Sequence, residues 1–198
     1  MRRTAFVAVP LCIVALAAGC ASAPSHFYTL NSTAKPADAA AAKSRLSIVV
    51  GPVSIPSIVD QPQVVVSTGP NEVALDEFNR WASPLQNNIA RVVAEDLVAI
   101  LGTPRVSLFQ QSLDANADYR VAIEVQRFDS APGEAATLGA AWIVRRTRDG
   151  RAEPGRTTVR EPVSGSGFDA LAAAHSSALA RMSQDIAGAI ASLERGTP

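Results

Sequence analysis

Both cysteines of this 198-residue chain lie within its first twenty residues, at Cys12 and Cys20. They belong to a segment with the form of an export signal, in which Arg2 and Arg3 precede an apolar stretch from Ala5 to Ala18. Such a stretch matches the hydrophobic region of a signal peptide and is too short to cross a bilayer as a helix. Removal of the signal before Cys20 would leave one cysteine, so no disulfide could form within the chain and the fold would depend on its hydrophobic core.

The end of the signal, from Leu16 to Cys20, resembles a lipobox, the site at which bacterial lipoproteins are cleaved and lipidated. Cleavage between Gly19 and Cys20 would place a diacylglyceryl group on the thiol of Cys20 and an N-acyl chain on its amine. Each buried methylene contributes about 0.8 kcal/mol, so two or three acyl chains anchor a protein firmly. The alternative is an ordinary secretory signal cleaved after Ala18 or Ala23, which would leave an unlipidated periplasmic protein.

The sequence therefore predicts a signal peptide at 1–19, a lipidated tether at 20–25 and a single domain at 26–195. Removal of 19 residues from 198 leaves 179, a length that suits one domain. Ala21 and Ser22 follow the cysteine where inner-membrane lipoproteins usually carry Asp, so by analogy we expect the outer membrane, with the domain facing the periplasm. A five-residue tether spans at most about 17–18 Å, which would keep the domain close to the lipid headgroups.

The charge balance excludes the basic face that binds nucleic acid. The whole chain has 18 basic and 18 acidic residues, and loss of Arg2 and Arg3 leaves 16 against 18. Hydrophobic residues make up 47% of the chain, which favours a folded domain over a disordered one.

Hydrophobic periodicity predicts an α/β domain in which two amphipathic helices pack on a sheet of mixed strand direction. One helix is expected to begin at Pro84 and to be stopped by Gly102 and Pro104, and a second runs from Ser166 to Gly196. Capping boxes are expected at the start of each helix, from Ser83 with Gln86 and from Ser166 with Asp169. Strands are predicted at 26–30, 46–53, 63–67, 73–76, 106–109, 119–126, 136–144 and 157–163.

The sequence contains no recognisable catalytic or metal-binding motif, so we expect neither an enzyme nor a metal site. Only His26 and His175 could serve as a general base, and His175 lies on the apolar face of the last helix, which favours a core or interface position. The adjacent acidic pairs Asp76-Glu77 and Glu95-Asp96 are expected to be solvated. No cofactor is expected other than the covalent lipid on Cys20.

Trp81 and Trp142 are the two largest side chains of the predicted domain. Core packing is one interpretation for both. The other is an apolar patch or groove that contacts acyl chains or a partner protein.

Several short segments, in their order and spacing, resemble the PqiC-type family of ABC-transport auxiliary lipoproteins over about residues 20–195. The resemblance implies a three-layer α/β/α fold with a mixed, roughly five-stranded sheet, similar to the anticodon-binding-domain class. It also implies a partner, the MCE-domain protein of a PqiB-like lipid transport system, and ring-shaped oligomers. The segments are Phe27-Tyr28-Thr29-Leu30, Gly51-Pro52-Val53-Ser54-Ile55-Pro56, Asp60-Gln61-Pro62-Gln63-Val64-Val65, Trp81-Ala82-Ser83-Pro84-Leu85, Arg127-Phe128-Asp129 and Leu138-Gly139-Ala140-Ala141-Trp142.

The expected role is a lipoprotein on the outer membrane that docks or collars a partner spanning the periplasm. Two alternatives remain open at this point. The domain could carry lipid in a groove of its own, or it could be a structural or assembly lipoprotein of the cell envelope.

Overall fold

The computed structural model describes residues 23–36, 45–109 and 116–196. The predicted cleavage site and Cys20 lie outside these residues. The elements in chain order are β1 His26–Tyr28, β2 Ile48–Ser54, β3 Gln63–Gly69, β4 Glu72–Trp81, α1 Leu85–Leu101, β5 Val106–Leu108, β6 Tyr119–Ala131, β7 Ala135–Arg146, β8 Ala152–Pro162 and α2 Gly167–Arg195.

The main sheet has five strands in the order β5-β2-β6-β7-β8. β2 is parallel to both of its neighbours, whereas β6, β7 and β8 form an antiparallel meander. The predicted α/β class, the mixed five-stranded sheet and the two amphipathic helices are therefore confirmed.

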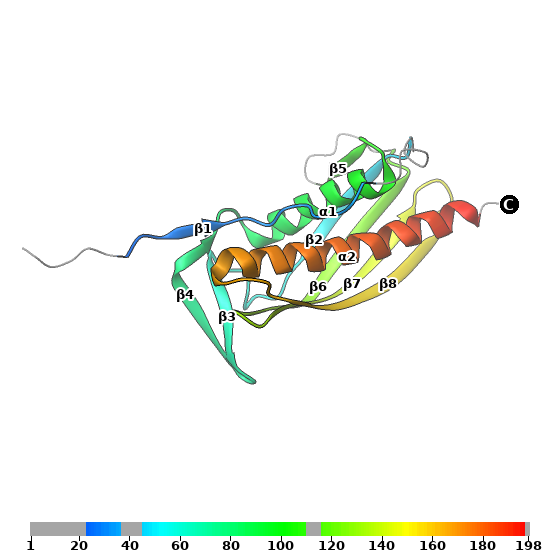
Figure 1. Ribbon diagram of the computed structural model, residues 1–198. Helices are drawn as coiled ribbons and strands as arrows, with labels where there is room; N and C mark the ends of the chain where they lie inside the picture. The colour runs from blue at the N-terminus through cyan, green and yellow to red at the C-terminus, as the bar shows by residue number, and fades with distance from the viewer. Residues whose placement is uncertain (1–22, 37–44, 110–115, 197–198) are drawn as a thin grey trace, which may run out of the picture.

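Both helices lie side by side on the same face of this sheet (Figure 1). α1 packs on β2 and β5, and α2 packs on β6, β7 and β8. The alternation along β6 follows from this arrangement, because Val121 and Ile123 are buried beneath the helices while Glu124, on the other face, is exposed.

The layering differs from the α/β/α arrangement that the resemblance implied. In the described part of the chain no helix covers the second face of the main sheet. That face carries small and charged side chains, such as Ala122, Ala141 and Arg145, which remain half-buried or exposed. The antiparallel strands β6, β7 and β8 need no second helical layer on such a face, because only their other face is apolar enough to require burial.

A second sheet of three strands, in the order β1-β4-β3, stands at one end of the molecule (Figure 1). β3 and β4 form the predicted hairpin, but both strands are longer than expected. β1 adds to β4 in parallel, so that the segment following the tether becomes an edge strand. The core is continuous across the two sheets, since Val64, Val65 and Trp81 belong to the same hydrophobic cluster as both helices.

The helix ends agree with prediction, but α1 begins one residue later than expected and the two predicted capping boxes are wrong. α1 ends at Gly102, whose left-handed backbone (φ 61°) suits glycine. Neither helix has a side-chain hydrogen bond at its N-cap, which is Pro84 in α1 and Ser166 in α2. The Gln86 amide donates to the carbonyl of Val53 instead, so its side chain ties α1 to β2.

Between β1 and the main sheet the chain crosses the two helices as an irregular segment, residues 29–34, which we call the strap (Figure 1). Its backbone is held from both sides. The Asn31 N–H donates to Ser176 Oγ on α2 at 3.1 Å, and the Arg91 guanidinium on α1 donates to the Leu30 carbonyl. The strap therefore connects the start of the described chain directly to the helical layer.

Candidate functional site

The predicted lipid-attachment residue Cys20 and cleavage position Gly19 precede the first described residue, Ala23, by a few positions. Residues 23–25 are exposed and lead straight into β1. The structure thus places the end of the predicted tether at the small sheet.

The prediction that the Glu95-Asp96 pair is solvated is wrong for Asp96. Glu95 is exposed and pairs with Arg91, but Asp96 is fully buried between the helices and the strap. Its carboxylate accepts hydrogen bonds from Ser32 Oγ at 2.6 Å and Ser183 Oγ at 2.9 Å. Burial raises the pKa of Asp96, and these hydrogen bonds oppose the rise.

Trp81 lies at the end of β4 and is only 6% exposed. Its ring contacts Phe128 edge to face, with ring centroids 6.3 Å apart, and contacts His175 in the same manner. This position matches the core-packing interpretation and leaves little of the indole free to meet a partner.

Trp142 lies on β7 beneath α2 and is 8% exposed. Its indole N–H donates to Thr157 Oγ1 at 3.1 Å, and the Thr157 hydroxyl donates in turn to Asp185 on α2. The ring lies over Gly155, where an added Cβ would come within 2.1 Å of it. Trp142 therefore fills a gap between β7, β8 and α2, and a glycine on β8 makes room for it.

His175 and Ser130 are hydrogen-bonded at 2.8 Å, the one contact among the described residues that brings a histidine to a hydroxyl. Both are buried, and the imidazole stacks on Phe128 at 3.9 Å, so no substrate can reach the pair. Complete burial lowers the pKa of His175 to about 3, and its Nδ1 has no partner among the described side chains to orient it. The pair is part of the core, as predicted for His175.

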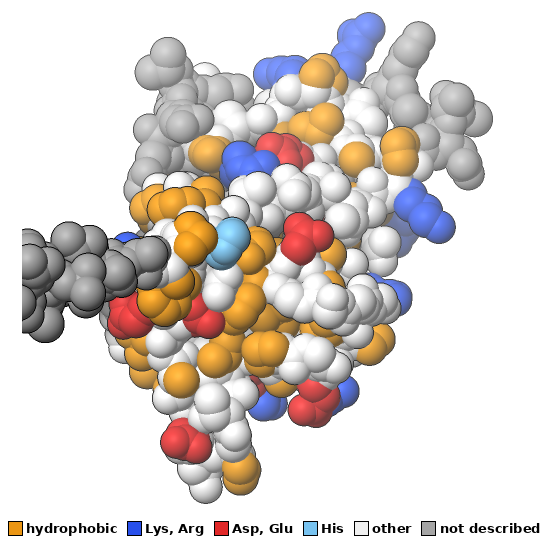
Figure 2. Space-filling model, turned by 60° about the vertical axis from the view of Figure 1, so that its left-hand side comes forward, with side chains coloured by type: hydrophobic (Ala, Val, Ile, Leu, Met, Phe, Trp, Pro, Cys, Tyr) orange, Lys and Arg blue, Asp and Glu red, His pale blue; other side chains and the backbone are white. Residues whose placement is uncertain are grey.

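Exposed hydrophobic side chains gather on and beside the small sheet. Among the large hydrophobic residues of the described chain, Phe27 is the most exposed at 65%, and Phe78 on β4 is 47% exposed. Val73 and Leu75 lie on the same strand and are also exposed. Figure 2 looks at this end of the molecule and shows hydrophobic side chains spread over its surface.

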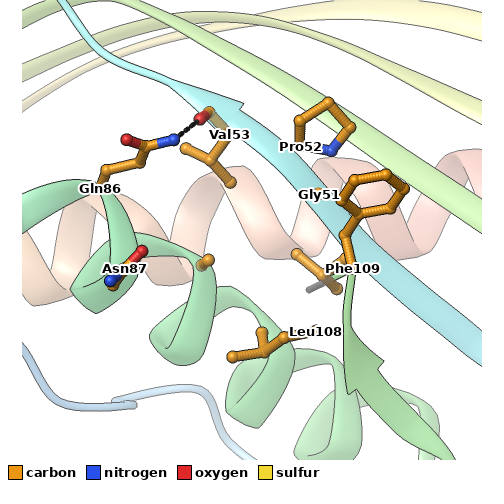
Figure 3. A pocket seen from close by; sticks show the side chains of 9 residues that line it. Gly51, Pro52, Val53, Gln86, Asn87, Leu108 and Phe109 are labelled. Atoms are coloured by element: carbon orange, nitrogen blue, oxygen red, sulfur yellow. Dashed lines mark hydrogen bonds between the residues drawn. The ribbon is translucent and has the colours of Figure 1, made fainter. Parts of the chain in front are cut away.

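A pocket of about 200 Å³ opens at the other edge of α1, between that helix and the ends of β2 and β5 (Figure 3). Gly51 and Pro52 form one wall and the half-exposed ring of Phe109 forms another. Gly51 has φ +118°, and a Cβ there would lie 2.9 Å from that of Phe109, so only glycine lets the two strands approach so closely. The remaining walls are Val50, Val53, Gln86, Asn87, Ala90 and Leu108.

The described residues contain no group of three His, Cys, Asp or Glu side chains that could hold a metal ion. Neither described helix is long and apolar enough to span a membrane. Three larger and more open hollows lie beside Arg146, beside the turn between β3 and β4, and beside Arg105, and charged side chains line each of them.

The fold is one that solved structures share. A protein from Xanthomonas campestris assigned to family DUF330 matches with a TM-score of 0.65 and 24% identity, over 82% of this chain and 93% of its own. An uncharacterised protein matches with a TM-score of 0.69 and 18% identity, over 85% and 99%. PelC dodecamers from Paraburkholderia phytofirmans match with a TM-score of only 0.41, too low to bear on this fold or its assembly. No curated protein matches the chain significantly.

These features define a small α/β domain with two helices on one face of a mixed five-stranded sheet. The sequence model of the ABC-type transport auxiliary lipoprotein components matches residues 28–187, most of the chain, and the protein belongs to this family. The resemblance described from the sequence motifs is thereby confirmed. The family is one of transport components and not a known family of enzymes.

The sequence analysis missed three features of the structure. It did not anticipate the burial of Asp96, the exposure of Phe27 and Phe78, or the pocket at Gly51-Pro52. In the sequence, Gly51-Pro52 is part of a segment that carries the family resemblance and gives no local sign of a pocket. Its place beside α1 depends on contacts between distant segments.

Proposed function

We propose that the protein is an outer-membrane lipoprotein of an MCE-type intermembrane lipid transport system, in which it docks the partner that spans the periplasm. Cys20 would carry the diacylglyceryl group and the N-acyl chain that hold it on the membrane. The observation that carries this proposal is membership of the transport auxiliary lipoprotein family over residues 28–187. The MCE partner and the outer membrane come from the family resemblance and from Ala21-Ser22 after the cysteine.

The pocket at Pro52 is our candidate for the docking contact. Its walls include Gly51, Pro52 and Val53, from one of the segments that carry the family resemblance, and its rim presents the exposed ring of Phe109. Exposed aromatic residues beside a small apolar hollow are typical of the anchor points of protein interfaces. Several copies held on one membrane would engage a partner together, so each contact could be weak.

The size of this pocket suits a docking contact better than the carriage of lipid at this place. Small-molecule pockets commonly enclose about 300–1,000 Å³ and bury most of their ligand. At about 200 Å³ the pocket accommodates a side chain of a partner rather than a whole phospholipid.

Site-specific photo-crosslinking in cells tests the docking proposal. A photoreactive residue at Asn87 or Phe109 should capture an MCE-domain protein, identified by mass spectrometry. The same residue at Thr158, exposed on the far strand β8, should not. Ala90→Leu, which fills the pocket from α1, should lower the yield of this crosslink without lowering the amount of folded protein.

Equal capture from Asn87, Phe109 and Thr158 would contradict docking at the pocket. Recovery of phospholipid bound to the purified protein, detected by native mass spectrometry and lost in Ala90→Leu, would favour the carrier alternative instead.

A further inference from the structure

We infer that the apolar end of the small sheet, formed by Phe27 on β1 and Phe78 on β4, inserts into the phospholipid membrane surface beside the lipid anchor. The inference rests on the proposed lipidation of Cys20. It adds a second membrane contact that fixes how the domain is oriented on the bilayer.

The two phenylalanines are presented by paired strands. In the parallel register His26 lies opposite Asn79 and Phe27 lies opposite Arg80, so Phe78 is next to the paired region of β1. Phe27 is 65% exposed and Phe78 is 47% exposed, so much of the apolar surface of each residue is in contact with water. Exposed apolar surface gathered in one place marks a contact with a membrane or a partner.

The exposure of Phe78 is built into the strand. The pairing of β3 with β4 shifts between Asp76 and Arg80, so the residues between them bulge from the hairpin. The Asp76 carboxylate accepts from the backbone N–H groups of Phe78 at 3.0 Å and Asn79 at 2.9 Å, and the Tyr28 hydroxyl binds the Asn79 side chain. These hydrogen bonds hold the bulge with Phe78 outward.

The position of the anchor identifies the membrane as the occupant of this surface. Phe27 is seven residues after Cys20, so a fully extended chain separates them by at most about 23–25 Å. The described chain starts at Ala23 and reaches β1 after three exposed residues. Acyl chains on Cys20 would therefore confine this end of the domain to the neighbourhood of the bilayer, where both aromatic side chains are within reach of it.

The charges around the two rings indicate contact through apolar insertion and not through attraction to anionic lipids. Asp76 and Glu77 flank Phe78, and Glu77 is near Arg80, with 3.8 Å between their charged groups. The surface thus offers no excess of positive charge to anionic headgroups. We expect the membrane contact to be insensitive to salt.

The experiment uses the lipidated protein, which carries no free thiol once Cys12 has left with the signal and Cys20 is acylated. Three single-cysteine variants, Phe27→Cys, Phe78→Cys and the control Val98→Cys, are labelled with an environment-sensitive dye. Val98 is an exposed apolar residue near the far end of α1, about 20 Å along the helix from its start. Each is measured in detergent and in phosphatidylethanolamine–phosphatidylcholine vesicles containing lipids with a quencher at a shallow or a deep acyl position.

In vesicles, dyes at positions 27 and 78 should shift their emission to shorter wavelength and be quenched most by the shallow lipid, at low and high salt alike. The dye at position 98 should do neither. A dye on Glu77→Cys tests the native rings, since its quenching should fall when Phe27→Ser and Phe78→Ser are introduced together.

Three outcomes would overturn the inference. Dyes at 27 and 78 that stay as water-exposed as the dye at 98, on protein with acylated Cys20, would do so and leave the proposed function intact. The same shielding in detergent, with a mass of two or more copies by light scattering, would make this surface a contact between copies. Absence of acylation at Cys20, measured separately by mass spectrometry, would overturn the membrane contact and the proposed function together.

Discussion

The His175 imidazole is a titratable group that the fold keeps neutral. Its ring is stacked on Phe128, hydrogen-bonded to Ser130 and fully buried. Burial lowers its pKa to about 3, from 6.5 in a solvated chain. The unfolded chain therefore takes up a proton below about pH 6.5 that the folded chain cannot, and this proton uptake favours unfolding.

We expect acid to destabilise the protein partly through this one residue. From about pH 6.5 down toward pH 3, His175 should lower the free energy of unfolding by up to about 1.4 kcal/mol per pH unit. His175→Gln keeps a polar group toward Ser130 but does not titrate in this range. The variant should therefore lack this loss of free energy of unfolding. Urea unfolding at about pH 7.5 and about pH 5 should show the wild type losing about 2 kcal/mol more than the variant. Equal losses would show that His175 titrates in the folded state.

At the scale of elements, the strap joins two parts that the chain order separates. It follows β1 of the small sheet and lies across α1 and α2, held by Asp96 from one helix and Ser176 from the other. Because Asp96 also binds Ser183, a single buried carboxylate connects three segments of the chain. Removal of this acceptor would take it from the half-buried Ser32 hydroxyl and Ala34 N–H, which is costly, whereas Ser183 also donates to the Leu179 carbonyl.

Two neighbouring carboxylates on α1 give a matched comparison for the strap. Asp96→Ala should lower the free energy of unfolding by about 1–3 kcal/mol and speed hydrogen exchange at Asn31 and Ala34. Asp96→Asn, which retains an acceptor, should cost less. The control Glu95→Ala removes only an exposed pair with Arg91 and should change stability by less than about 1 kcal/mol. If Asp96→Ala behaved like Glu95→Ala, the strap would not depend on the buried carboxylate.

At the scale of the whole molecule, the apolar end and the pocket lie on different parts of the surface. The apolar end belongs to β1 and β4, where the described chain begins, while the pocket lies between β2, β5 and α1. A domain that contacts the membrane at one place and a partner at another can hold that partner at a defined orientation. In the proposed function, this division of roles would depend on a lipid at Cys20.

The two cysteines provide the test of that anchor. Cys20→Ser should abolish labelling by a clickable fatty acid and release the protein from the membrane fraction or leave it uncleaved. Cys12→Ser, altered only within the signal segment, should be labelled and fractionate like the wild type. Labelling that persisted in Cys20→Ser would place the lipid elsewhere, and a wild type that stayed unlabelled would indicate an ordinary secretory signal.

Local patterns were enough to predict most of the elements. The alternation from Tyr119 to Val125 identified β6, and the apolar spacing after Leu85 identified α1 with its stop at Gly102. The family followed from short motifs in order. Each of these depends on neighbouring residues, whose side chains alternate along a strand or recur along a helix face.

Only the tertiary structure decided the layering, the fate of Asp96 and the surface at Phe27. The same strand pattern fits a sheet with both helices on one face and a sheet with one helix on each face. Alternation shows which side chains are buried but not which element covers them. Asp96 next to Glu95 has no local sign of burial, since its partners Ser32 and Ser183 are about 60 and 90 residues away along the chain. Phe27 is exposed because β1 ends as an edge strand beside β4, and pairing between distant segments depends on the packing of the whole chain.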